Sequence, residues 1–246
     1  IHQEGSGLPV PATAEIAAIG YVPPPEEDTE QEGPFGECTG YFTHGGGQPV
    51  MHVEEIWHRD DPILQGNPTM HGSAMRHALG AEIVTSARMW DAIDDEVPNV
   101  RGVYSIYQQC QQGAHITVVS VEQSYAGHAR QAAVEVLGSQ ANGTLSRAVI
   151  VVDEDIDPAD WEDVLFAFAT RCDPAQDIDI VRGMPDSHLD TRIPREQKRA
   201  GDTTTSTMLV NACKPYHWRD EFPETNAIDD ELREKMLEKW NVREWS

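Results

Sequence analysis

Two carboxylates that flank a short bend, Glu32 and Glu37, are the residues of this chain whose types and spacing most directly suggest chemistry. The Gly-Pro-Phe-Gly segment between them holds two titratable groups on one turn beside an aromatic ring. When two carboxyl groups share a partly apolar site, desolvation and like-charge repulsion raise one of the two pKa values. Such a pair suits proton transfer, and an acidic surface loop bent by Gly and Pro is the alternative interpretation.

This bend closely resembles the active-site segment of the UbiD family, decarboxylases that use prenylated FMN. Residues 10–16, of sequence VPATAEI, are similar to the family's V-P-A-x-x-E-I strand. Residues 151–174, which run from VVDEDID to TRCDP, are similar to its VVDDDxD…TRxDP signature. Three ordered matches are more specific than any one of them, and together they span nearly the whole chain.

The resemblance implies a role for each carboxylate. Glu37 resembles the family's proton donor, which acts after CO2 leaves, and Glu32 resembles the first carboxylate of a Glu-Arg-Glu network. Cys38, Met70 and His71 stand where the resemblance places substrate-pocket residues. The implied reaction is the reversible, non-oxidative decarboxylation of an aromatic, heteroaromatic or α,β-unsaturated acid through a covalent adduct with prenylated FMN.

Several of these positions have a second interpretation. Cys38 is also a candidate thiol nucleophile, although no His lies in a pattern that recommends it. His71 either hydrogen-bonds a phenol or heteroatom of the substrate or is a satisfied structural histidine. Lys214, in a segment similar to D-A-T-K-P of some members, either contacts the cofactor's phosphate or carboxylate or is merely solvated. Ile19 departs from the pattern, because many members have Glu there.

Members of the family are about twice as long as this chain, which begins at Ile1 inside the segment that resembles the cofactor-binding domain. The resemblance implies that the catalytic Arg and the Asn, His and Glu that hold the divalent metal and the flavin phosphate belong to the other half. The implied cofactors are prenylated FMN, with Mn and K held mainly by residues absent from this chain. A proteolytic fragment, one chain of a split enzyme and a partly determined sequence are all compatible with these residues.

Two other chemistries have weaker support. The segment HGGG at residues 44–47 is similar to the oxyanion segment of lipases and esterases, but the sequence contains no G-x-S-x-G nucleophile turn. Its glycines are better interpreted as part of a β-hairpin. His52, His58 and His77 lack the spacing of a metal site, so no self-contained metal centre is expected.

The charge of the chain bears on its partners. With 42 acidic and 18 basic residues, the formal net charge is −24 at pH 7. This charge disfavours nucleic acid, because no basic patch is available to release counterions from phosphates. An acidic surface of this kind is compatible with a host that has a high-salt cytoplasm and with an ordinary acidic enzyme.

Composition also bears on the compartment. No apolar run approaches the length of a membrane span, and the first residues lack the basic and apolar pattern of a signal peptide. The four cysteines, at positions 38, 110, 172 and 213, show neither metal-ligand nor redox spacing. We therefore expect a soluble, cytoplasmic protein with reduced cysteines.

The elements before residue 98 must position the carboxylates. Short β-type runs are predicted at residues 15–21, 38–43 and 50–57, with a Pro- and acid-rich loop at 22–31. By resemblance, residues 1–68 are the end of a β-rich, split-barrel-like domain that binds prenylated FMN. Apolar residues at helical spacing, among them Met70 and Val84, predict a helix over 69–91 within a connecting segment at 69–98.

Strands and helices alternate beyond residue 98. Strands are predicted at residues 103–108, 116–122 and 148–152, and helices at 125–137 and 158–170. Asp157 and Pro158 resemble an N-cap and first-turn pair for the second helix. The alternation predicts a three-layer unit at residues 99–190, so the expected fold class is α/β, or α+β overall. Residues 191–246 are expected to be a C-terminal loop, exposed over 192–207, and a helix at 229–240.

The sequence therefore favours the C-terminal half of a UbiD-like carboxy-lyase that acts on a small aromatic carboxylic acid. The implied partners are the N-terminal half of the same enzyme and further copies in a dimer or hexamer, to which the α/β domain contributes by resemblance. The alternative from a different class is a non-catalytic oligomerisation or scaffold chain. The presence of both Glu32 and Glu37 favours the enzyme, because a scaffold has no need of paired carboxylates on a turn.

Overall fold

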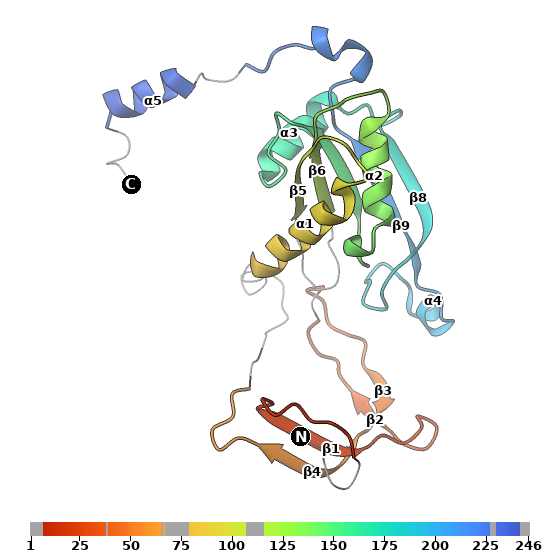
Figure 1. Cartoon of the computed structure of the whole chain (residues 1–246). Helices are drawn as coiled ribbons and strands as arrows, with labels where there is room; N and C mark the ends of the chain where they lie inside the picture. The colour runs from red at the N-terminus through yellow and green to blue at the C-terminus, as the bar shows by residue number, and fades with distance from the viewer. Residues whose placement is uncertain are drawn as a thin grey trace.

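The computed structural model of the chain describes residues 7–37, 39–64, 66, 79–106, 116–226 and 230–241 (Figure 1). Its N-terminal part consists of two antiparallel strand pairs. Strand β1 (Ile16–Tyr21) pairs with β4 (His52–His58), and β2 (Thr29–Glu32) pairs with β3 (Gly46–Pro49). The predicted strands at 15–21 and 50–57 are confirmed within a residue or two of their ends.

Two predictions for this part are wrong. Residues 38–43 form no strand among those described, since only an isolated bridge joins Gly36 to Phe42. The acid-rich segment at 22–31 is not entirely loop, because its last residues belong to β2. All four residues of β2 are exposed, so this strand lacks the apolar alternation that would reveal it, and its pairing with β3 defines it.

A five-stranded sheet forms the centre of the C-terminal part. Its strands are β5 (Val100–Ile106), β6 (Ile116–Val121), β7 (Ala148–Asp153), β8 (Ile178–Pro185) and β9 (Thr204–Asn211). The spatial order is β5-β6-β7-β9-β8. The three central strands are parallel, and the two edge strands are antiparallel to their neighbours.

Helices cover both faces of this sheet, as Figure 1 shows. Helices α1 (Leu79–Asp94) and α2 (His128–Gly138) pack on the face that includes Val119 and Val151. Helix α3 (Trp161–Arg171) packs on the other face, which includes Ile150. Because alternate residues of a strand face opposite sides, a strand covered on both faces must be apolar throughout, as β7 is up to Asp153. The predicted three-layer α/β unit is confirmed.

Helix α1 is rotated relative to its prediction. Val84 was expected on the apolar face, but it is 58% exposed. The buried positions are instead Ser86, Met89 and Ile93, which follow one another at helical spacing. The Ser86 hydroxyl fixes this orientation, because it accepts a hydrogen bond from the backbone N–H of Ser105 at 3.0 Å. Residues 67–78, and with them Met70 and His77, lie outside the described residues.

Helix α3 begins later than predicted. Its N-cap is Asp160, whose carboxylate accepts hydrogen bonds from the backbone N–H groups of Glu162 at 2.9 Å and Asp163 at 3.4 Å. Asp157, the predicted cap, instead accepts from the backbone N–H of Ala159 at 2.9 Å in the preceding turn. Both aspartates suit a cap, and only the path of the backbone selects one.

The expectation of an exposed loop over residues 192–207 is also wrong. This segment contains α4 (Arg195–Arg199) and the start of β9, which lies between β7 and β8 in the sheet. Thr207 is buried, and its hydroxyl donates to the Ser146 carbonyl at 3.0 Å. The sheet thus continues past the predicted boundary at residue 190, because β-branched Thr residues suit strands even when their polarity suggests a loop.

Two short helices follow β9. The 3₁₀ helix η3 (Tyr216–Glu221) comes directly after the sheet, and α5 (Asp230–Lys239) agrees with the predicted closing helix. Figure 1 draws α5 apart from the α/β body. Within the described part of the chain, no helix combines the length and the apolar character that crossing a bilayer requires.

Candidate active site

The segment that holds Glu32 and Glu37 is the irregular end of the β2–β3 hairpin. Glu32 is the last residue of β2 and lies opposite Gly46. Beyond it, the backbone N–H of Thr43 donates to the Phe35 carbonyl at 2.9 Å, and the N–H of Phe35 donates to the Thr43 hydroxyl at 3.1 Å. These bonds close the two arms of the hairpin between the carboxylates.

Glu37 itself is held at the tip of this hairpin. Its backbone N–H donates to the Tyr41 carbonyl at 2.9 Å, and its carbonyl accepts from the Gly40 N–H at 2.8 Å. The Glu37 side chain is half-buried, whereas Glu32 is exposed. The two carboxylates therefore share one hairpin but differ in their surroundings.

Gly45 allows the two arms of the hairpin to approach each other closely. Its φ of +65° lies in the left-handed region that side chains rarely adopt. A Cβ atom at this position would lie 2.9 Å from the Glu32 carbonyl oxygen and 3.1 Å from the Gly33 carbonyl carbon. Gly45 is thus required where the chain returns past Glu32.

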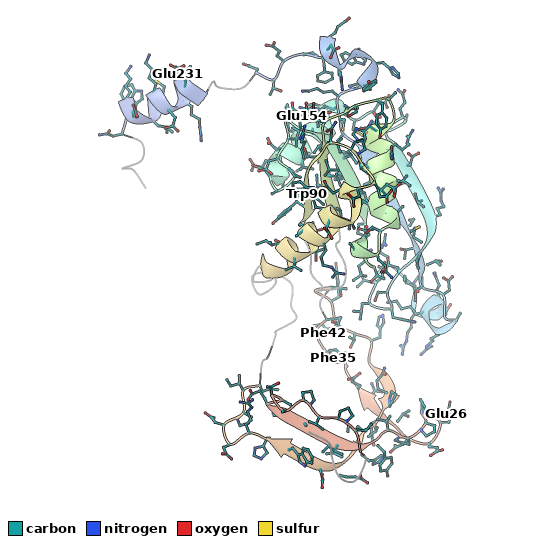
Figure 2. All side chains as sticks on the ribbon, in the orientation of Figure 1. Glu26, Phe35, Phe42, Trp90, Glu154 and Glu231 are labelled. Carbon is teal, nitrogen blue, oxygen red and sulfur yellow. The ribbon has the colours of Figure 1, made fainter. Side chains whose placement is uncertain are left out.

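A cleft of about 520 Å³ lies between the hairpin tip and the α/β domain. One wall comes from residues 37, 39 and 41–44, and the other comes from residues between 188 and 198. Figure 2 shows Phe42 on the part of the hairpin nearest the α/β body. The volume is within the range of about 300 to 1,000 Å³ that small-molecule sites occupy. The lining residues used below are Glu37, Tyr41, Phe42, Leu189, Ile193 and Lys198.

A buried ion-pair cluster fixes the second wall. Asp190 is fully buried, and its carboxylate lies 2.9 Å from Arg192 Nη2 and 3.2 Å from Arg147 Nη2. The same two arginines approach the Asp186 carboxylate at 3.3 and 3.4 Å. Burial alone would raise the pKa of Asp190, but the hydrogen bonds from Arg192 outweigh it and lower that pKa to about 2.

Only part of the predicted site falls within the described residues. Glu37 lines the cleft, while Glu32 lies just behind it on β2 and is not among the lining residues. Cys38, Met70 and His71 lie outside the described residues. For these three positions, the assignment to the substrate pocket stays a prediction.

Lys214 belongs to a different part of the domain. Its ammonium lies 2.7 Å from the Asp155 carboxylate, which also receives two bonds from the guanidinium of Arg171 at 2.8 and 2.9 Å. Lys214 follows the end of β9, whereas Lys198 precedes its start, and eight residues of strand span about 26 Å. The structure therefore does not bring Lys214 together with Glu37, and its contact with a cofactor stays a prediction.

The sequence analysis missed the second wall of the cleft. Of its residues, Lys198 lies in the segment 192–207 that was expected to be an exposed loop, and His188 and Leu189 lie just before that segment. The alternating charges of Asp186, Asp190 and Arg192 were the available signal for a fixed turn. That signal does not connect the turn to the hairpin, because nothing local pairs segments so distant in sequence.

The described part of the chain offers few side chains for metal binding or for thiol chemistry. No three or more His, Cys, Asp or Glu side chains gather there in a way that could hold a metal ion. Cys172 and Cys213 are free thiols, and burial raises the pKa of Cys213 well above its ordinary value. A buried thiol of this kind is unreactive.

Two family models match the chain. The 3-octaprenyl-4-hydroxybenzoate carboxy-lyase Rift-related domain (UbiD) matches residues 1–72. The C-terminal domain of the same carboxy-lyase (UbiD_C) matches residues 78–212. Their order and boundaries follow the division of the structure into a strand-pair region and an α/β unit.

Solved structures of related enzymes match more than nine-tenths of the chain. The UbiD-class enzyme HmfF from Pelotomaculum thermopropionicum, in complex with FMN, is 28% identical with a TM-score of 0.68, and the match covers 92% of this chain and 47% of that one. Vanillic acid decarboxylase from Sedimentibacter hydroxybenzoicus, in its closed form, is 26% identical with a TM-score of 0.73 and coverages of 94% and 47%. The chain thus spans about half the length of these relatives.

Proposed function

The chain belongs to the UbiD family of carboxy-lyases, and from this premise we propose that it is the part of a prenylated-FMN-dependent decarboxylase that carries the proton donor, Glu37. The observation that supports this role is the position of Glu37, half-buried at the edge of a cleft of about 520 Å³. A proton donor must reach its substrate while keeping a defined position, and the hairpin bonds of Glu37 meet the second need.

The cleft fits a planar ring system. Phe42, Leu189 and Ile193 give it an apolar lining beside the Glu37 carboxyl, and Tyr41 and Phe42 are the residues of this chain that would contact a flavin ring. Prenylated FMN supplies the electron sink that decarboxylation of an aromatic acid requires. Mn and K enter the proposal through the other half of the enzyme, as the family resemblance implies.

The residues of this chain then have separate tasks. Glu37 donates a proton to the substrate carbon that has lost CO2, and in the reverse direction it removes that proton. Glu32, the last residue of β2 and directly before the bend, orients an arginine supplied by the other half. Cys38, Met70 and His71 line the substrate pocket. The related decarboxylase from Sedimentibacter hydroxybenzoicus acts on vanillic acid, and by analogy we assign an aromatic acid to this chain.

Replacement of the two carboxylates in the holoenzyme tests these roles. Glu37→Gln should lower turnover by about a hundredfold or more, because an amide cannot supply the proton. Glu32→Gln should lower it by about tenfold or more through the loss of a charge partner. Turnover is measured as CO2 release and as exchange of the ring hydrogen in D2O. Glu30→Gln removes the same charge from an exposed position of β2 and serves as the control.

Near-native turnover of Glu37→Gln would contradict the assignment of Glu37 as the proton donor. The spectrum of the native particle tests the enzyme as a whole. Bound flavin together with a polypeptide that carries the missing arginine supports the decarboxylase. A colourless particle of this chain alone would instead favour the non-catalytic scaffold.

A further inference from the structure

The wall of the cleft that faces Glu37 carries a cation that pairs with none of the described side chains. Lys198 lines the cleft from α4 and is half-buried. It is the only Lys or Arg among the described lining residues. Its ammonium forms no ion pair or side-chain hydrogen bond with the described part of the chain, whereas Lys214 is paired with Asp155.

The net negative charge of the chain makes a local cation such as Lys198 important for binding an anion. At a net charge of −24, the molecule repels an anionic ligand over most of its surface. An anion can approach only where a local cation offsets that repulsion, and a cleft with partly apolar walls strengthens such a local interaction. Among the described lining residues, Lys198 is the lysine or arginine that can offset this repulsion for an anionic oxygen.

The position of Lys198 is fixed by the surrounding turn. Its backbone N–H donates to the Pro194 carbonyl at 3.1 Å, and the Gln197 side chain donates to the Thr204 carbonyl at 3.2 Å, which ties α4 to the start of β9. The ion pair between the buried Asp190 and the more exposed Arg192 holds the residues just before α4. A cation presented by such an anchored segment is preorganised for binding.

The lining between the two charged residues is mixed, and its polar members are Thr39, Thr43, His44, His188 and Thr191. Among its apolar members, Phe42 comes from the hairpin wall, and Leu189 and Ile193 come from the α/β wall. Glu37 and Lys198 line the same cleft from its two different walls, so a ring bound between the walls can present one edge to each residue. The arrangement suits a ring that bears polar groups at both ends.

We propose that Lys198 binds a second oxygen group of the substrate, a carboxylate or a phenolic oxygen, on the side of the ring opposite the carboxyl that leaves as CO2. This inference rests on the proposed decarboxylase function and narrows its substrate class. The preferred substrates are aromatic acids with a further carboxylate or phenolic oxygen, and unsubstituted benzoate is a poor ligand. Lys198 is a specificity residue, because it contacts the substrate but takes no part in proton transfer.

Binding of three probe acids to the full chain tests the proposal. Benzene-1,4-dicarboxylate, 4-hydroxybenzoate and benzoate are titrated separately, and dissociation constants are measured from NMR chemical shifts. The chain should bind at least one of the two substituted acids about tenfold more tightly than benzoate. The substituted acid that binds more tightly identifies the second group on the ring as a carboxylate or a phenol.

Three variants assign the preference to Lys198. Lys198→Gln should bind the substituted acids no better than benzoate, and Lys198→Arg should keep most of the preference, because it retains the charge. Lys235→Gln removes the same charge from α5 and should bind as the unchanged chain does. Retained preference in Lys198→Gln, or no binding of any probe by the unchanged chain, would overturn the inference.

The binding test needs no flavin, so its failure is separate from failure of the proposed function. Normal turnover with no role for Lys198 in binding would leave the decarboxylase standing and reject the specificity residue. Loss of the preference in Lys198→Gln, with Glu37→Gln still active, would support Lys198 as a specificity residue and reject Glu37 as the proton donor.

Discussion

Asp190 is not among the residues that line the cleft, but it helps to fix the second wall. It is fully buried and shares Arg147 and Arg192 with Asp186, so it joins the segment before β7 to the turn before α4. Removing one member of a buried ion-pair group leaves the remaining charges uncompensated. Asp190 is therefore a positioning residue for the wall that presents Lys198.

The depressed pKa of Asp190 gives its contribution a defined pH dependence. A folded-state pKa of about 2, below the unfolded value of 3.8, means that the stabilisation is present above pH 3.8 and is lost as the pH falls through about 2. About 1 kcal/mol of it should disappear between about pH 6 and pH 3. Asp190→Asn should lose about 3 kcal/mol of unfolding free energy at neutral pH, and this deficit should shrink by about 1 kcal/mol at the acidic end.

Urea denaturation across this pH range measures the deficit. Asp220→Asn is the control, because the Asp220 side chain is 96% exposed and its pair with Arg219 should be worth less than about 1 kcal/mol. A deficit for Asp190→Asn that stays constant with pH would contradict the assignment of the acid-labile stabilisation to this carboxylate.

At the scale of elements, the hairpin decides where Glu37 lies. Strands β2 and β3 contribute only four residues each and bury little side chain, so the backbone bonds and the turn geometry carry their stability. Gly45 and Gly46 are neighbours with different constraints. Gly45 has a positive φ and close contacts, while a Cβ at Gly46 would meet nothing within 4 Å.

Gly45→Ala should therefore open the hairpin, whereas Gly46→Ala should not. A residue other than Gly in the left-handed region costs about 1 to 2 kcal/mol, and the contact with the Glu32 carbonyl adds to this cost. Amide hydrogen exchange at Phe35 and Thr43, whose N–H groups close the hairpin, should accelerate by about tenfold in Gly45→Ala. Equal exchange rates in the two variants would show that Gly45 does not maintain the turn.

At the scale of the whole molecule, acidic charge dominates. The formal net charge of the chain is −24. Helix α5, which has Leu232 and Met236 exposed and is followed by the exposed Trp240, is drawn apart from the α/β body (Figure 2 labels Glu231 on this helix). Like charges repel more strongly in the compact state than in the extended one. Salt should relieve this repulsion, since the Debye length falls from about 30 Å at 0.01 M to about 3 Å at 1 M.

The thermal midpoint should accordingly rise by several degrees when NaCl is increased from about 0.01 M to about 0.5 M at pH 7. The same series near the sequence pI of about 4.6 is the control, because the net charge is close to zero there. A midpoint that falls with salt at pH 7 would indicate that ion pairs such as Arg192 with Asp190 outweigh the overall repulsion.

Some features of this protein followed from the sequence alone because they depend on neighbouring residues. The apolar run at residues 148–152 could only be a buried strand, and it is the centre of β7. The bend between Glu32 and Glu37 was recognisable from its residue types, and the UbiD resemblance of the surrounding motifs agrees with both matched family models. Local composition carried each of these predictions.

Only the tertiary structure decided the features that join distant segments. Thr-rich residues 204–207 were expected in a loop, yet they begin β9 because they pair with β8, and from Met208 onward the strand also pairs with β7. Val84 lies outside the core because packing against β5 selects the face that includes Met89. Glu37 and Lys198 line one cleft because the hairpin and the segment before β9 are brought together in space. Sequence neighbours specify the elements, and the free energy of packing between elements specifies which of them meet.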